Sequence, residues 1–426
     1  MVLREPFSIH SLQSRCGCPP QLTNRTDKVH PSVGLAFQPI HSRLFLCLEE
    51  LLRYSGSPKQ IRVTRLMPVL DFGGVESRIT LQAEMIDRDR FDYRVCTFWK
   101  AGAAAERIRA AGIQVDVLDV DPAVRNPIAT KELAAYLRRN PTDILHASIS
   151  EANFHGAVAG ALTGVPIRIV EEVGIPSRGR LGTFVFGQMY GLANRVVGVS
   201  KATCKVLLQE GAGEEKVHLI YNCANPSFFT GKPEEIIARP DSPPVEFLAV
   251  GRLVPVKNHL NLLRAFRKAL NQNPSIRLRI AGEGPLRGDM ESLIEELELQ
   301  NHVQLLGFQS DVRSLLHTSH FFLLPSWSEG CSISLVEAMS SDIVPFGSTA
   351  DGIGEVMGKL GSDHQIPADD VDGWANALLR ASRMTSAERF RIGAAAREIA
   401  FRRFSPAVYI GNVSQMYEEM ARSILI

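Results

Sequence analysis

The amino-acid sequence predicts an α/β protein with two doubly wound domains behind an N-terminal extension. Three observations lead to this fold class. The 426 residues exceed what one hydrophobic core comfortably holds. Short apolar strands alternate with helical segments, the pattern of parallel βαβ units. A proline-rich break at residues 226–244 divides the alternation into two series, as an interdomain linker would.

The composition is that of a soluble globular protein, with 45% hydrophobic and 22% charged residues. A formal net charge of +1 excludes the basic field on which general nucleic-acid binding depends. The seven cysteines show no C-x-x-C spacing, so we expect thiols rather than a zinc site. No apolar stretch approaches the roughly 20 residues that span a bilayer. We expect a cytoplasmic protein, with peripheral association at the inner face of a membrane as the alternative.

The first half of the chain predicts a loose extension at residues 1–60 and a first domain at residues 61–225. The domain opens with a strand at residues 61–69, a glycine turn around Gly73 and Gly74, and a helix. Further strands are expected at residues 93–98, 115–118, 144–147, 166–170 and 195–199, and helices at residues 103–111, 131–139 and 154–162.

The second domain is predicted at residues 245–405. Strands are expected at residues 245–250, 277–281, 303–306 and 321–325, and helices at residues 258–271, 286–299 and from Ser334. Because ligands bind beyond the carboxyl ends of the strands in open parallel sheets, we expect the site in the gap between the two domains.

A first candidate anion site follows the strand at residues 245–250. Arg252 and Lys257 stand between this buried strand and the next helix. A guanidinium and an ammonium there can neutralise a diphosphate leaving group, whose developing charge opposes cleavage of a sugar–phosphate bond. The alternative is that both are solvated surface charges.

A second cluster combines a strand, a glycine-containing loop and the start of a helix. Backbone N–H groups around Gly330, Cys331 and Ser332 would face a phosphate at the helix N-terminus. Glu329 and Glu337 flank this loop, where Glu337 can accept hydrogen bonds from ribose hydroxyls and Glu329 from the sugar. The alternative is a capping box in which Glu337, three residues after Ser334, only closes the helix start.

These motifs occur in a specific order along most of residues 61–426. The order comprises Gly73-Gly74-Val75-Glu76, Val199-Ser200-Lys201, Tyr221-Asn222, Gly251-Arg252 with Lys257, Ala281-Gly282-Glu283-Gly284-Pro285, Glu329-x7-Glu337, the segment 351–356 as the loop after the next strand, and Arg403-Phe404-Ser405 with Tyr417. The set resembles the retaining GT-B glycosyltransferases of family 4.

The resemblance implies two facing Rossmann-like domains, with a terminal helix at residues 406–426 that returns to the first domain. It implies transfer of a sugar from a nucleotide-sugar donor to a glycan or lipid-linked acceptor, with retention of configuration. The residues that match the catalytic positions are Arg252, Lys257 and Glu329. Those on the donor side are Gly251, Gly282, Gly284, Gly330, Cys331, Ser332 and Glu337. Those on the acceptor side are Gly73, Gly74, Glu76, His146 and Glu172.

We expect no cofactor and no metal, because Arg252 and Lys257 can do the neutralising. The basic segment at residues 176–180, with Arg178 and Arg180, is expected on the acceptor side. For His146 two interpretations stay open, since it either faces the gap between the domains or fills the domain surface. His155, inside the alanine-rich helix, is expected to be packed.

The chain also departs from the family pattern. Val173 stands where the family often has a histidine near the sugar, so this role is vacant or taken by Glu171 or Glu172. Asp342 stands near an expected glycine. Two alternatives therefore remain: a weakly active or inactive paralogue that binds a nucleotide sugar, and a nucleotide-sugar 2-epimerase of similar architecture. A dehydrogenase is disfavoured, because no acidic residue ends the strand after Gly282-x-Gly284.

Overall fold

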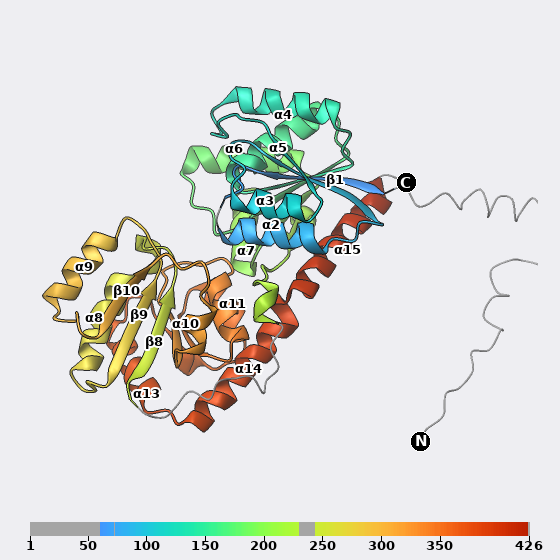
Figure 1. The fold of residues 1–426 in the computed structure, drawn as a ribbon. Coiled ribbons are helices and arrows are strands. Elements are labelled where there is room, and N and C mark those ends of the chain that lie inside the picture. The colour runs from blue at the N-terminus through green and yellow to red at the C-terminus, as the bar shows by residue number, and fades with distance from the viewer. Residues whose placement is uncertain (1–59, 72, 230–242, 425–426) are drawn as a thin grey trace, which may run out of the picture. The chain divides into compact units, whose positions relative to one another are not determined.

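The structure is a computed structural model that describes residues 60–71, 73–229 and 243–424. The chain divides into two units, Met1–Pro58 and Lys59–Ile426, and the description concerns the second. The expected N-terminal extension and most of the expected linker lie outside the described residues. Lys59–Ile426 contains two parallel sheets, and helices alternate with the strands of each sheet along the chain. The predicted fold class of two Rossmann-like domains is thereby confirmed (Figure 1).

The first domain is built on a seven-stranded parallel sheet of order β3-β2-β1-β4-β5-β6-β7. The strands are β1 (Ile61–Met67), β2 (Phe91–Thr97), β3 (Gln114–Val117), β4 (Ile144–Ser148), β5 (Ile167–Glu172), β6 (Arg195–Gly198) and β7 (Val217–Leu219). The helices are α2 (Gly74–Met85), α3 (Ala103–Ala110), α4 (Pro127–Arg139), α5 (Ser150–Leu162), α6 (Arg180–Leu192), α7 (Lys201–Gln209), η2 (Glu214–Lys216) and η3 (Pro226–Phe228). The strand order reverses between β1 and β4, where ligands bind in such sheets.

The second domain has a six-stranded parallel sheet of order β10-β9-β8-β11-β12-β13, which reverses between β8 and β11. The strands are β8 (Val245–Val250), β9 (Ile276–Ala281), β10 (Val303–Gly307), β11 (Phe321–Leu324), β12 (Val344–Ser348) and β13 (Gln365–Ile366). The helices are η5 (Pro255–Lys257), α8 (His259–Leu270), α9 (Arg287–Glu296), α10 (Arg313–His317), α11 (Ile333–Ser340), α12 (Asp351–Met357), η6 (Ser362–His364), α13 (Val371–Ser382) and α14 (Ser386–Phe404). A terminal helix, α15 (Pro406–Ile424), follows α14.

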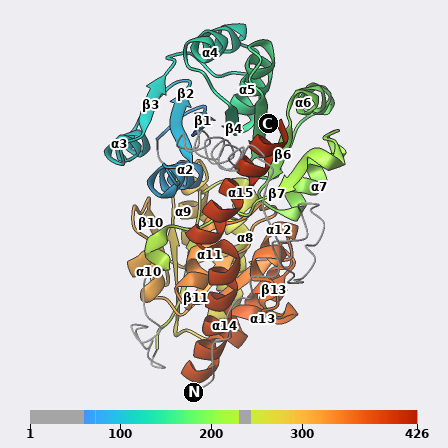
Figure 2. The same cartoon turned by 90° about the vertical axis from the view of Figure 1, so that its right-hand side faces the viewer.

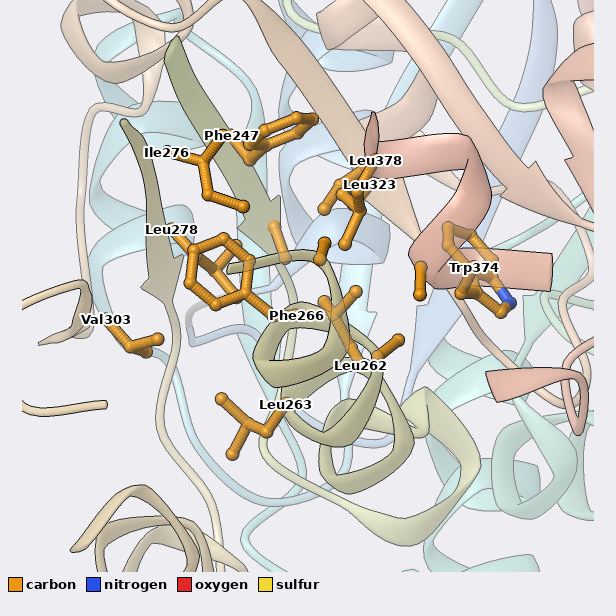
Figure 3. Packing of buried hydrophobic residues seen from close by; sticks show 14 of the residues in the cluster. Phe247, Leu262, Leu263, Phe266, Ile276, Leu278, Val303, Leu323, Trp374 and Leu378 are labelled. Atoms are coloured by element: carbon orange, nitrogen blue, oxygen red, sulfur yellow. The ribbon is translucent and has the colours of Figure 1, made fainter. Parts of the chain in front are cut away.

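The core of the second domain forms where α8 and α13 cover its sheet. Leu262, Leu263 and Phe266 of α8 recur at helical spacing, and each is at most 1% exposed. They belong to one apolar cluster with Phe247 of β8 and Trp374 of α13 (Figure 3). This packing fixes the central strand β8, which leads into the segment that carries Arg252 and Lys257.

The terminal helix α15 packs on the first domain although it directly follows α14 (Figures 1 and 2). Tyr409, Val413, Tyr417 and Met420 lie on one face of α15 and are each at most 4% exposed. They join the apolar cluster formed by the first sheet and α2. The last helix of the chain is therefore part of the core of its first domain.

Three local differences from the expectations have physical causes. α4 begins at Pro127 rather than at residue 131, because the Asn126 side chain accepts from the Ile128 amide and proline suits the first helical turn. The segment 351–356, expected as a loop, forms helix α12. Asp342 takes the left-handed conformation with φ 55° that favours glycine, and it forms an ion pair with Arg397 at 2.6 Å.

Candidate functional site

The candidate catalytic residues lie where the second sheet reverses its strand order. β8 and β11 are parallel neighbours there, so the segments that follow them leave the same edge of the sheet. The segment after β8 carries Arg252 and Lys257. The β11–α11 loop, residues 325–332, carries Glu329. Strand pairing thus brings together two motifs that are far apart in the sequence.

Lys257 and Glu329 form an ion pair. The Lys257 Nζ lies 2.5 Å from the Glu329 Oε1, and the side chains are 17% and 12% exposed. Ser326 Oγ donates a hydrogen bond to the same carboxylate oxygen at 2.7 Å. The Trp327 amide donates to the Val256 carbonyl at 2.8 Å, which fastens the two segments together. The ammonium can neutralise an incoming anion, while the carboxylate can accept hydrogen bonds from hydroxyl groups.

Glycines bring the main chains around Arg252 into close contact. A Cβ atom at Gly282, whose φ is 150°, would lie 1.9 Å from the Gly251 carbonyl oxygen. One at Gly284 would lie 2.4 Å from the Leu253 carbonyl oxygen. The Arg252 side chain is exposed and makes no hydrogen bond or ion pair with any described residue. Its guanidinium is therefore available to a ligand.

The start of α11 offers backbone amides to an anion. Ser332 is the N-cap residue, but its side chain makes no capping hydrogen bond. The first amides of the helix therefore lack a side-chain acceptor from this residue, and the helix dipole favours an anion there. Gly330 and Cys331 precede the cap. A Cβ atom at Gly74 of the first domain would lie 2.8 Å from the Ile333 Cδ1, so the first domain's glycine turn adjoins this helix start.

Glu337 lies too far along α11 to close a capping box, because the helix begins at Ile333. The capping interpretation is therefore wrong, and Ser334 Oγ instead donates to the Val250 carbonyl at 3.2 Å. The carboxylate of Glu337 has no hydrogen-bond partner among the described residues. Burial, together with the nearby Asp311, raises the pKa of Glu337 to about 8. An unpartnered carboxylate of this kind can accept hydrogen bonds from the hydroxyl groups of a ligand.

The glycine turn of the first domain precedes α2. Gly73 is the N-cap residue of α2 and Gly74 is its first residue, and both are exposed. Glu76, in the first turn, is partly buried, and this burial raises the pKa of its carboxyl. Of the five residues predicted on the acceptor side, these three stay at the end of the domain that adjoins α11.

His146 is not on the acceptor side, and neither open interpretation of it is correct. Its side chain is buried at 1% exposure, and Nδ1 lies 2.7 Å from the Tyr417 hydroxyl of α15. Burial, and then the charge of Arg65, lowers the pKa of His146 to about 3. A neutral histidine enclosed by the terminal helix does not contact a substrate. His155 is packed as expected, with Nδ1 2.7 Å from the Thr130 hydroxyl.

Glu172 and Arg178 are also enclosed, which corrects two expectations. Arg178 lies 2.6 Å from Glu172 and 2.5 Å from Glu210, and its guanidinium carbon is 3.7 Å from the centre of the Phe186 ring. Glu172 is 4% exposed. The basic acceptor-side segment is thereby reduced to Arg180, which is exposed.

Glu171 is the centre of a buried arginine cluster, formed by Arg65, Arg78 and Glu171. Its carboxylate accepts from Arg65 at 2.8 Å, from Arg78 at 2.8 and 3.0 Å, and from Ser148 at 2.5 Å. Burial by itself would raise the pKa of Glu171, but Arg78 and Arg65 hold it well below its ordinary value. A carboxylate with these partners cannot replace the family histidine missing at Val173.

Two residues without an assigned role contact the candidate site, and a third joins helices α12 and α7. Ser326 bonds Glu329, as described, and no sequence pattern marks it. Asn222 donates to the Cys331 carbonyl at 3.2 Å. Glu355 of α12 accepts from the first two amides of α7, those of Lys201 and Ala202, both at 2.8 Å. Asn222 and Glu355 do belong to motifs of the ordered set, which was the only signal for them.

The described residues contain neither a metal-binding cluster nor a membrane-spanning helix. Within residues 60–71, 73–229 and 243–424, no group of three or more histidine, cysteine, aspartate or glutamate side chains is arranged to hold a metal ion. No helix in this part of the chain has the length and apolar character needed to span a membrane.

Each domain matches a known protein family. A family model described as Glycosyltransferase Family 4 matches residues 72–228, and one described as Glycosyl transferases group 1 matches residues 234–399. The UDP-Gal:alpha-D-GlcNAc-diphosphoundecaprenol alpha-1,3-galactosyltransferase of Escherichia coli is 24% identical over 364 residues, which cover 77% of this chain and 89% of that protein.

Two further similarities extend the comparison. The N-acetylgalactosamine-N,N'-diacetylbacillosaminyl-diphospho-undecaprenol 4-alpha-N-acetylgalactosaminyltransferase of Campylobacter jejuni is 32% identical over 158 residues, which cover 37% of this chain and 42% of that protein. The crystal structure of Anabaena HepE in complex with UDP and glucose superposes with a TM-score of 0.73 at 19% identity, covering 84% of this chain and all of HepE. At this identity the superposition shows the fold.

The two family models together span both domains, in the order that the motifs predict. The chain therefore belongs to the GT-B glycosyltransferases of family 4, also described as group 1, which are enzymes that use nucleotide-sugar donors.

Proposed function

We propose that this chain transfers a hexose from a UDP-sugar to a lipid-linked glycan acceptor, with retention of the anomeric configuration. The observation that carries the proposal is the Lys257–Glu329 ion pair beside the uncapped start of α11. The choice of UDP is supported by the UDP bound to HepE, and the choice of acceptor by the diphosphoundecaprenol in the name of the Escherichia coli relative.

In the proposed reaction the bond between the sugar C1 and the diphosphate oxygen breaks, and the electron pair leaves with the diphosphate. Arg252, Lys257 and the first amides of α11 neutralise this developing charge. An acceptor hydroxyl oxygen forms the new bond to C1, and its proton passes to the departing diphosphate. Glu329 orients the sugar hydroxyls, and Glu337 holds the ribose hydroxyls. With two side-chain cations in these roles, the proposed step needs no metal ion.

Incubation with labelled UDP-hexoses and a diphosphoundecaprenol-linked sugar tests this function. We expect a glycosylated lipid whose anomeric proton coupling, in NMR of the early product, matches the donor configuration, formed at an unchanged rate in EDTA. An inverted product would contradict retention. A rate abolished by EDTA and restored by manganese would contradict the metal-free step. An epimerised sugar nucleotide would favour the epimerase, and donor binding without turnover the inactive paralogue.

The raised pKa of Glu337 predicts that nucleotide binding depends on pH. In the free protein this carboxyl is largely protonated at pH 7, since its pKa is about 8. Two ribose hydroxyls that donate to it favour the charged form and so lower this pKa. Binding should therefore release a proton at pH 7, and affinity should rise with pH up to about 8 and then level off.

Titration calorimetry with UDP in two buffers of different ionisation enthalpy measures this proton. The Glu337→Gln variant should lose the proton release and bind UDP more weakly by about 1–3 kcal/mol. Protons released by the phosphate itself are common to both proteins and cancel. Equal proton release and equal affinity in both proteins would remove Glu337 from the donor site.

A further inference from the structure

The β11–α11 loop is held on two sides by other elements. A Cβ atom at Gly330 would lie 3.1 Å from the Gly174 Cα and 3.2 Å from the Val199 Cγ2, both in the first domain. On the other side, a Cβ atom at Gly352 of α12 would lie 1.9 Å from the Gly330 carbonyl oxygen and 2.2 Å from that of Glu329. The loop main chain therefore has little room to move while these contacts persist.

Asn222 makes the hydrogen bond from the first domain to this loop. It is 5% exposed, its Nδ2 donates to the Cys331 carbonyl at 3.2 Å, and its Oδ1 accepts from the Arg78 Nη1 at 2.6 Å. The orientation of the amide is fixed, because a guanidinium can only donate. Arg78 in turn donates to both carboxylate oxygens of Glu171. A continuous chain of polar contacts thus runs from the buried arginine cluster to the loop.

We propose that Asn222 is a positioning residue for the donor diphosphate, which acts by holding the Cys331 carbonyl so that the amides at the start of α11 keep their direction. The inference rests on the proposed function of this site and adds a residue that touches neither sugar nor nucleotide. The Asn222–Cys331 hydrogen bond joins the first domain to the β11–α11 loop of the second domain. The geometry of the phosphate site therefore depends on the contact between these two domains.

The Asn222→Asp variant separates this role from a purely structural one. Aspartate keeps an oxygen that accepts the hydrogen bond from Arg78. Its added negative charge lies beside two guanidinium groups, those of Arg65 and Arg78, which otherwise share the single carboxylate of Glu171. The domain should therefore stay folded. The substitution replaces the donor to Cys331 with an oxygen that repels the carbonyl. The matched control is Gln82→Met. Gln82 is buried on α2, as Arg78 is, and the change removes its 3.1 Å hydrogen bond to the Tyr417 hydroxyl.

The measurements are the affinities for UDP and for uridine and the melting temperature. We expect Asn222→Asp to bind UDP about tenfold more weakly than the wild type, with uridine affinity and melting temperature unchanged, and Gln82→Met to leave both affinities unchanged. Asn222→Ser, which loses both bonds, should show the same selective loss. Unchanged UDP affinity, or equal losses for UDP and uridine, would overturn the inference. A wild-type chain that binds no UDP would instead overturn the proposed donor.

Discussion

Replacing Lys257 with alanine is expected to lower kcat by about 10²–10³-fold, the range seen when one preorganised group that stabilises a developing negative charge is removed. The physical reason is the position of the ammonium, which is only partly exposed and already pairs with Glu329 at 2.5 Å. When the diphosphate leaves, the Lys257 ammonium can stabilise its negative charge, and little solvent has to reorganise. Affinity for UDP should also fall, because in the proposed complex the ammonium contacts the diphosphate in the ground state too.

The matched control is Lys268→Ala, which removes a lysine of α8 whose ion pair with Asp372 is outside the site. That pair has a similar distance, 2.6 Å, but its side chains are 51% and 74% exposed. Activity should stay within about twofold, since exposed ion pairs contribute little. Single-turnover rates of both variants decide the matter, and equal rates for Lys257→Ala and Lys268→Ala would exclude Lys257 from the reaction.

The pair also predicts how Lys257 and Glu329 combine. Glu329→Ala should lower kcat while UDP affinity changes less than about threefold, because in the proposed reaction this carboxylate orients the sugar and not the nucleotide. The double variant should be little slower than Lys257→Ala, since residues that act as a unit are not additive. If the losses in kcat were fully additive, Lys257 and Glu329 would act independently in the complex with the donor, although they form an ion pair in the free protein.

Those features of the fold that depend on local sequence could be predicted. Alternating apolar strands and helices predicted both sheets, and apolar spacing such as that of Leu262, Leu263 and Phe266 marked the helix that covers the second sheet. The same local signals placed Arg252, Lys257 and Glu329 at strand ends. Their meeting depends on β8 pairing with β11, because strand order is a tertiary property that periodicity does not report.

The sequence-based predictions that were wrong concern residues whose contacts come from distant parts of the chain. His146 lies next to the end of the strand expected at residues 144–147, as many cleft residues do, but its partner Tyr417 is 271 residues away on the returning helix α15. Glu171 and Glu172 looked like free carboxylates because their arginine partners Arg65, Arg78 and Arg178 show no recognisable spacing to them. Burial of a charge depends on a partner, and the partner is found only in three dimensions.

Glu171→Gln is expected to destabilise the first domain strongly, although it leaves the side-chain volume intact. The carboxylate is 1% exposed and serves two guanidinium groups that are no more than 1% exposed. Breaking a buried pair by removing one partner costs about 3–5 kcal/mol, because the remaining charges stay buried. For a domain of this size the melting temperature should fall by on the order of 10 °C. Glu291→Gln, whose pair with Arg287 is 55% and 37% exposed, should change it little.

The pH dependence distinguishes loss of this ion pair from a general packing defect. The folded-state pKa of Glu171 is lowered by Arg78 and Arg65 against the effect of burial, so its contribution to stability is complete above its unfolded pKa of about 4.3. As the pH falls below that value, the unfolded chain takes up a proton that the folded protein does not, and the contribution declines. The difference in denaturation midpoint between the wild type and Glu171→Gln should therefore be constant between pH 6 and 8 and shrink between about pH 5 and 4. A difference that stays constant to pH 4 would mean that the lost stability comes from packing and not from the carboxylate charge.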